Sequence, residues 1–455
     1  MHHQPIGIHE RPPLAKWIPL SIQHVFAMFS ATVLVPLLTG FSPSVALFTS
    51  GLGTLLYIAV TGGQVPAYLG SSFAFIAPLI SVGTSPAYGP EYALGAAFVV
   101  GIFYALVAGL IRLFGKSWLS RLLPPVVIGS VIIVIGLSLS PVAMGQVFYL
   151  DGEFSMPAVL IALVTLGIAI ISSIFLKGFF TVIPILLGIV GGYLFTLIMG
   201  SVNPAFALID FSAVQEGGWI SLPSIMGLKF DIIPISVFLI VSLATISEHL
   251  GDTLVIGRVI GKDIYEKPGL HRTLLGDGLA TSVAALFGGP PNTTYGENIG
   301  VMAISRVYSV WVVGGAAVIA LVLSFFHKFG LLIQTIPSPV MGGITMMLFG
   351  IIASAGIRTL VESGVDYSHK RNLIVSSVIL VIGIGGGALK FATGEGLEFE
   401  LSGVALATLV GIVLNLLLPD IDKEVLEEQK EIEAERLAQQ AKEAAKIETA
   451  YVDQD

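Results

Sequence analysis

Residues 288–306 read GGPPNTTYGENIGVMAISR, and this stretch decides the fold because it interrupts an otherwise apolar part of the chain. It carries prolines, glycines and the carboxylate of Glu297. Lipid cannot hydrogen-bond a broken backbone, so such a segment survives at membrane depth only where protein covers it or where it lines a cavity. An ionisable residue at that depth is also costly. The stretch is therefore a candidate binding site, although a polar re-entrant turn at the membrane edge would give a similar pattern.

The composition is that of a polytopic membrane protein. Apolar residues make up 55% and charged residues 11% of the 455 residues, and the mean hydropathy is +0.91. Most of the net charge of -8 comes from the acidic residues 420–455, so no nucleic-acid partner is expected. The chain contains no cysteine, which excludes disulfides, thiolate metal sites and cysteine nucleophiles.

Hydrophobic segments long enough to cross a bilayer recur along the chain. A spanning helix needs about twenty mostly apolar residues, and shorter interrupted segments indicate discontinuous spans. The predicted spans are 17–38, 44–61, 64–82, 92–113, 123–143, 156–176, 179–200, 232–251, 270–288, 291–305, 307–326, 332–354, 372–389 and 402–418. Lysine and arginine favour cytoplasmic loops, and they gather on alternate loops of this chain. The pattern predicts fourteen spans with both termini in the cytoplasm.

Internal matches indicate two repeats of seven spans. The matched groups are Pro125, Val126, Gly129, Gly136 and Ser140 with Pro339, Val340, Gly343, Gly350 and Ser354, then Gly62, Gly63 and Gly70 with Gly288, Gly289 and Gly296, and finally Gln23-His24 with Glu248-His249. Because seven is odd, the second repeat is inverted. The third and tenth spans, both interrupted, then face one another near the midplane, where their free backbone groups can point at one ligand.

Ionisable residues cluster at the end of the predicted span 232–251. Glu248 and Asp252 are four residues apart and share a helix face, whereas His249 is turned away by about 100°. A carboxylate pair on one face suits proton binding, because burial and a neighbouring negative charge both favour the protonated form. Asp252 could instead mark the cytoplasmic end of the helix.

Three other residues in the predicted spans are candidates. His24 is either a packed core residue or part of a proton relay, and we place it behind the site rather than in it. Phe73 lies at the break of the third span and could stack on a planar ligand, although most of the 26 phenylalanines must be core residues. Asp277, between two glycines, is interpreted as a helix-end contact.

A membrane-embedded metalloenzyme is the alternative from a different class. Catalytic zinc usually takes three protein ligands that include histidine, commonly at i,i+4 on one helix face. Here the i,i+4 pair consists of two carboxylates, Glu248 and Asp252, and the other embedded histidine is His24. The pattern favours a protein without metal, without another cofactor and without enzymatic activity.

These residues form a recognisable pattern. Glu297-Asn298-x-Gly300-x-x-x-x-Ser305-Arg306 resembles the signature of the nucleobase-ascorbate transporter family, with serine at 305 where threonine is usual. Residues 21–24, 70–74, 247–249 and 293–303 resemble the bacterial uracil permease branch, so the resemblance covers 15–418. One position departs from that branch: Asp252 stands where a uracil permease has histidine, which leaves the proton-coupling role of this position open.

The resemblance implies an all-α polytopic membrane fold with fourteen spans in two inverted seven-span repeats, in which short strands break spans three and ten. It implies a core domain of residues 15–113 (spans 1–4) and 232–326 (spans 8–11), and a gate domain of 123–200 (spans 5–7) and 332–418 (spans 12–14). Residues 1–14 are then a cytoplasmic N-terminus and 419–455 a charged cytoplasmic tail. A homodimer through the gate domain is a further implication.

The implied substrate contacts are Glu248, Glu297, Phe73, Gly296 and Tyr295, and the residues implied in proton coupling are Glu248, Asp252, His24 and Glu297. Uracil presents two ring N–H donors and two carbonyl acceptors around a flat ring, which carboxylates, free backbone N–H groups and a phenyl ring can match. We therefore expect a proton-coupled uracil importer of the plasma (inner) membrane that works by alternating access. A xanthine or purine permease of the same family is the nearest alternative. An anion transporter with this fold is disfavoured, because two embedded carboxylates would repel the anion.

Overall fold

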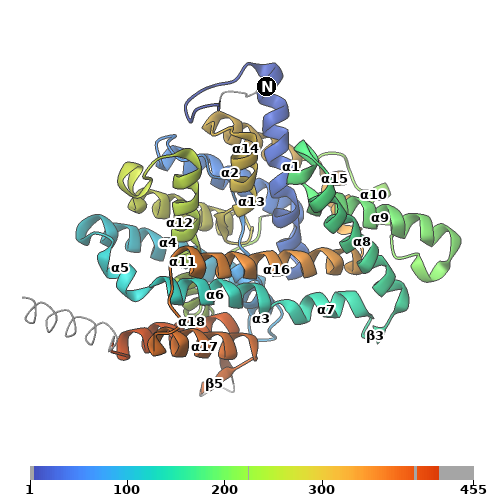
Figure 1. The fold of residues 1–455 in the computed structure, drawn as a ribbon. Coiled ribbons are helices and arrows are strands. Elements are labelled where there is room, and N and C mark those ends of the chain that lie inside the picture. Colours follow the sequence, from blue (N-terminus) through green and yellow to red (C-terminus); the bar gives the residue numbers. More distant parts are fainter. Residues whose placement is uncertain (1–4, 224, 394–396, 420–455) are drawn as a thin grey trace, which may run out of the picture.

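The computed structural model describes residues 5–223, 225–393 and 397–419, and it is mostly helical (Figure 1). Residues 420–455 of the predicted tail lie outside the described residues. The elements of the first half are α1 (Leu14–Thr39), α2 (Pro43–Val60), β1 (Leu69–Ser71), the 3-10 helix η1 (Phe73–Phe75), α3 (Ile76–Gly83), α4 (Pro90–Phe114), α5 (Ser117–Leu122), α6 (Pro125–Leu137), α7 (Ser140–Phe148), β2 (Tyr149–Leu150), β3 (Glu153–Phe154), α8 (Met156–Phe175), η2 (Gly178–Val182), α9 (Pro184–Val202), η3 (Pro204–Phe206) and α10 (Ser212–Glu216).

The second half begins at a long helix and repeats the pattern of a strand that interrupts helices. Its elements are α11 (Ile232–Ile260), the π turn η4 (Tyr265–Gly269), α12 (Leu270–Leu286), β4 (Asn292–Thr294), α13 (Gly296–Ser305), α14 (Val310–Ser324), α15 (His327–Gln334), α16 (Ser338–Glu362), α17 (Lys370–Ile384), β5 (Ala388–Thr393), β6 (Leu397–Ser402) and α18 (Gly403–Leu417).

The two interrupted segments meet as a two-stranded antiparallel sheet. Strand β1 pairs with β4, and Leu69 lies opposite Thr294. Beyond the paired residues, the N–H of Tyr295 donates to the carbonyl of Tyr68 at 2.9 Å. Each half thus satisfies the broken backbone of the other, which is what lipid surroundings require. The prediction that short strands break the third and tenth segments is confirmed.

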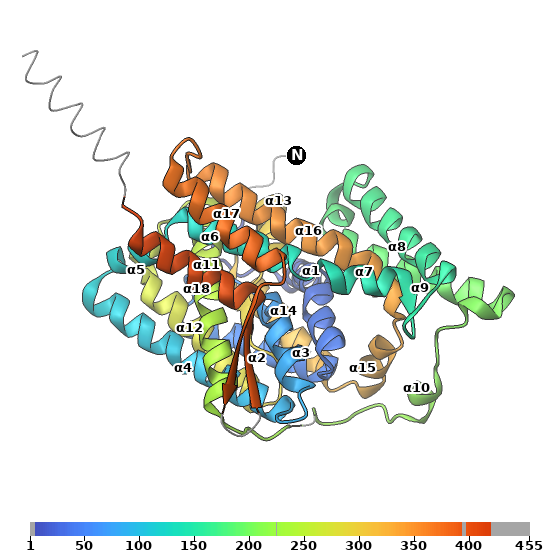
Figure 2. The same cartoon turned by 90° about the horizontal axis from the view of Figure 1, so that it is seen from below.

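Helix packing divides into two sets (Figures 1 and 2). Helices α1, α2, α4, α11, α12 and α14 contact one another, whereas α6, α7, α8 and α9 contact α16, and α17 contacts α6 and α18. The sets touch where α11 contacts α6 and α18 and where α1 contacts α9. The main contacts of the paired strands in the described chain are with α1, α2, α11 and α12, which are all helices of the first set. The sets follow the predicted core and gate ranges, but the domain division itself stays a prediction.

Within the described chain, eight helices are long and apolar enough to cross a membrane, with α6 and α7 counted as one, and three shorter apolar helices accompany them. The number of spans, fourteen, stays a prediction. Several boundaries differ from the predicted ones. Helix α11 continues to Ile260 rather than 251, and α17 ends at Ile384 rather than 389 because three consecutive glycines, residues 385–387, follow it.

Candidate substrate-binding site

The predicted site residues come together beside the β1–β4 sheet. Glu297 lies in the first turn of α13, directly after β4, and Phe73 opens η1, two residues after β1. Glu248 lies on α11, and this helix contacts both η1 and α13. One long unbroken helix therefore faces the two breaks, and it carries the second carboxylate toward them.

Solvent exposure indicates a hollow at the start of α13. Gly296 is exposed although Tyr295 before it and Asn298 after it are buried. A Cβ atom built on Gly296 would meet no other atom within 4 Å. Glu297 and Glu248 are partly exposed, and neither side chain is among the buried residues. Because α11 contacts both η1 and α13 here, we interpret this exposed surface as that of a recess between the three elements.

The recess is rich in carboxyl groups. Glu248 lies within electrostatic range of Asp252, Asp277 and Glu297. The Oε2 atom of Glu248 is buried and has no hydrogen-bond partner among the described residues. An unpaired buried acceptor is destabilising, so a ligand N–H placed there would gain the full value of the hydrogen bond. Among the residues that the structure describes, no group of three or more His, Asp and Glu side chains is placed to hold a metal ion.

Tyr295 ties the two halves together. Its hydroxyl donates to the carbonyl of Ser71 at 3.1 Å and accepts from the hydroxyl of Thr32 at 3.2 Å. The ring lies directly over Gly70, where a Cβ atom would come within 2.5 Å of it. The side chain of Tyr295 is thus occupied in holding β1 against β4. Its predicted part in substrate contact stays a prediction.

Replacing Gly70 by alanine is expected to lower the midpoint of thermal unfolding. The new methyl group would push the Tyr295 ring away from β1, and such overpacking typically destabilises by about 1–3 kcal/mol. Gly109→Ala is the matched control, because a Cβ atom there meets nothing within 4 Å. Thermal unfolding of both purified variants, followed by tryptophan fluorescence, measures the difference. Equal midpoints for the two variants would contradict this account of the sheet.

His24 is buried on α1, next to the first turn of α13. The side chain is 1% exposed, and the Asn298 amide donates to its Nδ1 atom at 3.0 Å and to its carbonyl oxygen at 3.1 Å. Asn298 follows Glu297 in α13, so this pair of hydrogen bonds fixes α13 to α1. His24 therefore contributes to the orientation of the first turn of α13, and its role in proton coupling stays a prediction.

Asp252 faces the sheet. The hydroxyl of Thr294, the last residue of β4, donates to its Oδ2 atom at 3.0 Å. Helix α11 continues for two further turns, to Ile260, so the interpretation of Asp252 as the end of this helix is wrong. Its side chain instead connects α11 to the strand that leads into Glu297.

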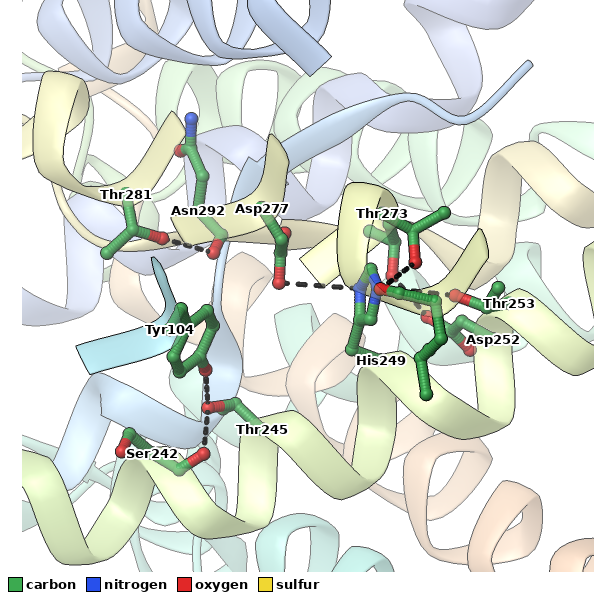
Figure 3. A network of polar contacts seen from close by, with 12 residues as sticks. Tyr104, Ser242, Thr245, His249, Asp252, Thr253, Thr273, Asp277, Thr281 and Asn292 are labelled. Atoms are coloured by element: carbon green, nitrogen blue, oxygen red, sulfur yellow. Dashed lines mark hydrogen bonds and ion pairs between the residues drawn. The ribbon is translucent and has the colours of Figure 1, made fainter. Parts of the chain in front are cut away.

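Sequence reasoning missed the partnership of His249 and Asp277 (Figure 3). His249 Nδ1 lies 3.5 Å from Asp277 Oδ2, and both side chains are fully buried. His249 Nε2 also lies 3.3 Å from the hydroxyl of Thr253. The interpretation of Asp277 as a helix-end contact is wrong, because this residue lies in the middle of α12.

The available signal for this pair was the glycines around Asp277. A Cβ atom at Gly278 would lie 2.5 Å from Tyr104 on α4, and one at Gly276 would lie 2.8 Å from Tyr57 on α2. Two glycines that bracket an embedded acid therefore indicate a helix packed closely on both sides, with the acid buried between its neighbours. Tyr104 in turn hydrogen-bonds Thr245 of α11, one turn before His249 (Figure 3).

Comparison with known proteins agrees with these observations. A family model described as the permease family matches residues 15–390. The chain is 48% identical over 436 residues to the uracil permease of Bacillus subtilis (strain 168), which covers 92% of this chain and 96% of that protein. It is 44% identical over 420 residues to the uracil permease of Escherichia coli (strain K12), which covers 92% and 94%. These relatives are named as permeases, not as enzymes.

Solved structures show the same fold at low sequence identity. The transmembrane domain of the cyanobacterial bicarbonate transporter BicA superposes with a TM-score of 0.59 at 16% identity, over 89% of this chain and 97% of that chain. The structure of SLC26A9 gives a TM-score of 0.67 at 10% identity, over 89% and 65%. The predicted fold class, a helical membrane fold of inverted repeats, is confirmed. The family match and the relatives together show that the chain belongs to this permease family, the nucleobase-ascorbate transporters, and that it is a multi-pass membrane transport protein.

Proposed function

We propose that this chain imports uracil by proton symport, with the core domain moving against the gate domain in alternating access. The observation that carries the proposal is that Gly296 is exposed at the start of α13 while two partly exposed carboxylates, Glu248 and Glu297, lie within electrostatic range of each other. Relatives named as uracil permeases, at 44–48% identity over nearly their full length, support the choice of substrate.

The chemistry of the recess suits uracil. The carboxylates accept hydrogen bonds from the two ring N–H groups, while the first N–H groups of α13 have no partner within the helix and can donate to a carbonyl. Phe73, which is 8% exposed, covers one face of the flat ring. A neutral ligand with both donors and acceptors fits this set better than an anion, which the carboxylates would repel.

The carboxyl cluster also suits proton coupling. Glu248 lies within electrostatic range of Asp252, Asp277 and Glu297, and His249 Nδ1 lies 3.5 Å from Asp277 Oδ2. Moving one uncompensated charge across the membrane requires about 2.3 kcal/mol per 100 mV. Protonation of the cluster before the core domain moves removes that barrier and lets the proton gradient drive import.

We place the protein in the plasma (inner) membrane with both termini in the cytoplasm. This orientation follows from the basic residues of alternate loops, among them Arg112, Lys116, Arg258, Lys262 and Arg272. These residues lie near the C-terminal ends of α4 and α11 and near the N-terminal end of α12. We therefore place these three helix ends on the cytoplasmic side. Dimerisation through the gate domain stays a prediction.

Uptake of labelled uracil into proteoliposomes tests the proposal. Accumulation above equilibrium is expected with an imposed inward proton gradient, and only equilibration without it. Competition by unlabelled xanthine separates the two nucleobase alternatives. In a uracil importer, excess unlabelled uracil should suppress the uptake of labelled uracil, whereas xanthine at the same concentration should not. Uptake that ignores the gradient would contradict symport, and stronger competition by xanthine would contradict the choice of uracil.

Replacing Asp277 by asparagine is expected to abolish gradient-driven accumulation while uracil binding persists. Asparagine keeps the shape of the buried side chain opposite His249 but cannot carry a proton or a charge. Uracil exchange across proteoliposomes without a gradient is the companion measurement, because it reports binding and movement without coupling. The control is Glu266→Gln, which changes an exposed carboxylate. Normal accumulation in Asp277→Asn would exclude the pair from the proton route.

A further inference from the structure

A cavity of about 460 Å³ opens where three helices of the core set end on the cytoplasmic side. It lies beside the last turns of α2 and α4 and the first turn of α12. The lining residues are Ala59, Val60, Arg112, His271, Arg272 and Leu275. None of them is acidic, and none belongs to the recess at Gly296.

Among the described residues, no acidic side chain pairs with the positive charge of this cavity. Arg112 and Arg272 lie within electrostatic range of His271. Within the described chain, neither arginine forms an ion pair, and neither guanidinium donates a hydrogen bond to a protein group. Arg258, on the same side of the molecule, differs, because it pairs with Glu362 at 2.9 Å. Like charges gathered without a counter-ion repel one another, so the arrangement is suited to a bound anion.

The surroundings of the cavity are those of a lipid-facing surface. The last turns of α4, which carry Arg112, also expose apolar side chains: Leu110, Leu113 and Phe114 are 42%, 76% and 73% exposed, and Leu113 is the nearest of them to Arg112 around the helix. Leu275, Val60 and Ala59 contribute apolar lining to the cavity itself. An occupant would therefore find cationic groups at the level of the membrane surface and apolar side chains immediately below.

We propose that this cavity binds the headgroup of an anionic phospholipid of the cytoplasmic leaflet. The guanidinium groups of Arg112 and Arg272 would bind the phosphate, since arginine can donate two parallel hydrogen bonds to phosphate oxygens. The N-terminal N–H groups of α12, a helix of 17 residues, add a favourable dipole. The acyl chains would leave the cavity over Leu113, next to Arg112, toward the exposed apolar side of α4. Basic pockets between membrane helices on the cytoplasmic side are suited to such headgroups. The assignment of the side rests on the orientation proposed above, whereas the binding itself does not depend on uracil transport.

Native mass spectrometry of the delipidated full-length protein in detergent tests this site. The probes are dioleoyl phosphatidylglycerol and dioleoyl phosphatidylethanolamine, which share acyl chains and differ in net charge. We expect phosphatidylglycerol to bind more tightly. The double variant Arg112→Gln/Arg272→Gln should weaken its binding by roughly thirtyfold, on the basis of the usual contribution of a basic residue near a membrane surface. Arg112→Lys/Arg272→Lys keeps the charge and should retain binding within a few-fold, which also controls for folding.

Arg258→Gln is the matched control, because it removes an arginine that already has a protein partner at the same end of the molecule. It should leave binding of phosphatidylglycerol unchanged. Equal binding of the two lipids, or equal loss in Arg258→Gln and the double variant, would overturn the proposal. Inorganic phosphate is included as a competitor: displacement of the lipid at comparable concentrations would show a site for a soluble anion and would equally overturn it. Because lipid binding is measured without transport, these outcomes can be interpreted even if the protein does not take up uracil.

Discussion

Replacement of Glu297 by glutamine is expected to abolish measurable uracil binding. A carboxylate presents only acceptors, whereas the amide presents donors on one side, so a uracil N–H would face another N–H. Loss of a hydrogen bond to a charged group typically weakens an interaction by about 1.5–3 kcal/mol, and the mismatched donor adds to this. An affinity loss of roughly a hundredfold or more is therefore expected. Isothermal titration calorimetry with the purified protein measures it.

The control for this experiment is a carboxylate outside the recess. Glu362 lies at the end of α16, is exposed and pairs with Arg258, so Glu362→Gln should bind uracil as the unchanged protein does. Glu297→Gln should keep its thermal stability, because the side chain is partly exposed and its size hardly changes. If Glu297→Gln bound uracil with normal affinity, Glu297 would not belong to the site.

The breaks in the third and tenth segments could be predicted from the sequence because the responsible residues are local. Residues 288–291, GGPP, cannot continue a helix, and the apolar flanks of this stretch require its backbone to be covered by protein. The antiparallel pairing of β1 with β4 follows from the inversion of the repeats. The same argument placed Glu297 and Phe73 at the two breaks.

The buried pair of His249 and Asp277 could not be predicted in the same way, because it depends on contacts between distant helices. Helical spacing correctly turned His249 away from Glu248, but it says nothing about which helix lies on the other side. That position is set by α4 and α12, which approach closely at Gly101 and Gly278. The C-terminal end of α11 could not be predicted for a related reason. The apolar pattern shows where a helix leaves the bilayer, but the hydrogen-bonded helix can continue beyond that point.

Replacement of Glu248 by alanine is expected to reduce uracil uptake to the level of liposomes without protein. The substitution removes an acceptor whose Oε2 atom no described residue satisfies, and it removes one negative charge from the cluster. Both binding and coupling should therefore fail, with and without a proton gradient. The midpoint of thermal unfolding should not fall, because a buried carboxylate oxygen without a partner destabilises the fold rather than supports it.

This combination of lost uptake and retained stability separates a functional carboxylate from a structural one. Glu266→Ala, in the exposed segment after α11, is the control that should change neither quantity. Glu248→Gln should likewise lack the response to the gradient, since an amide cannot take up a proton. Normal uptake by Glu248→Ala would contradict the proposed role. Lost uptake together with a clearly lowered unfolding midpoint would instead assign Glu248 to the packing of α11 against η1 and α13.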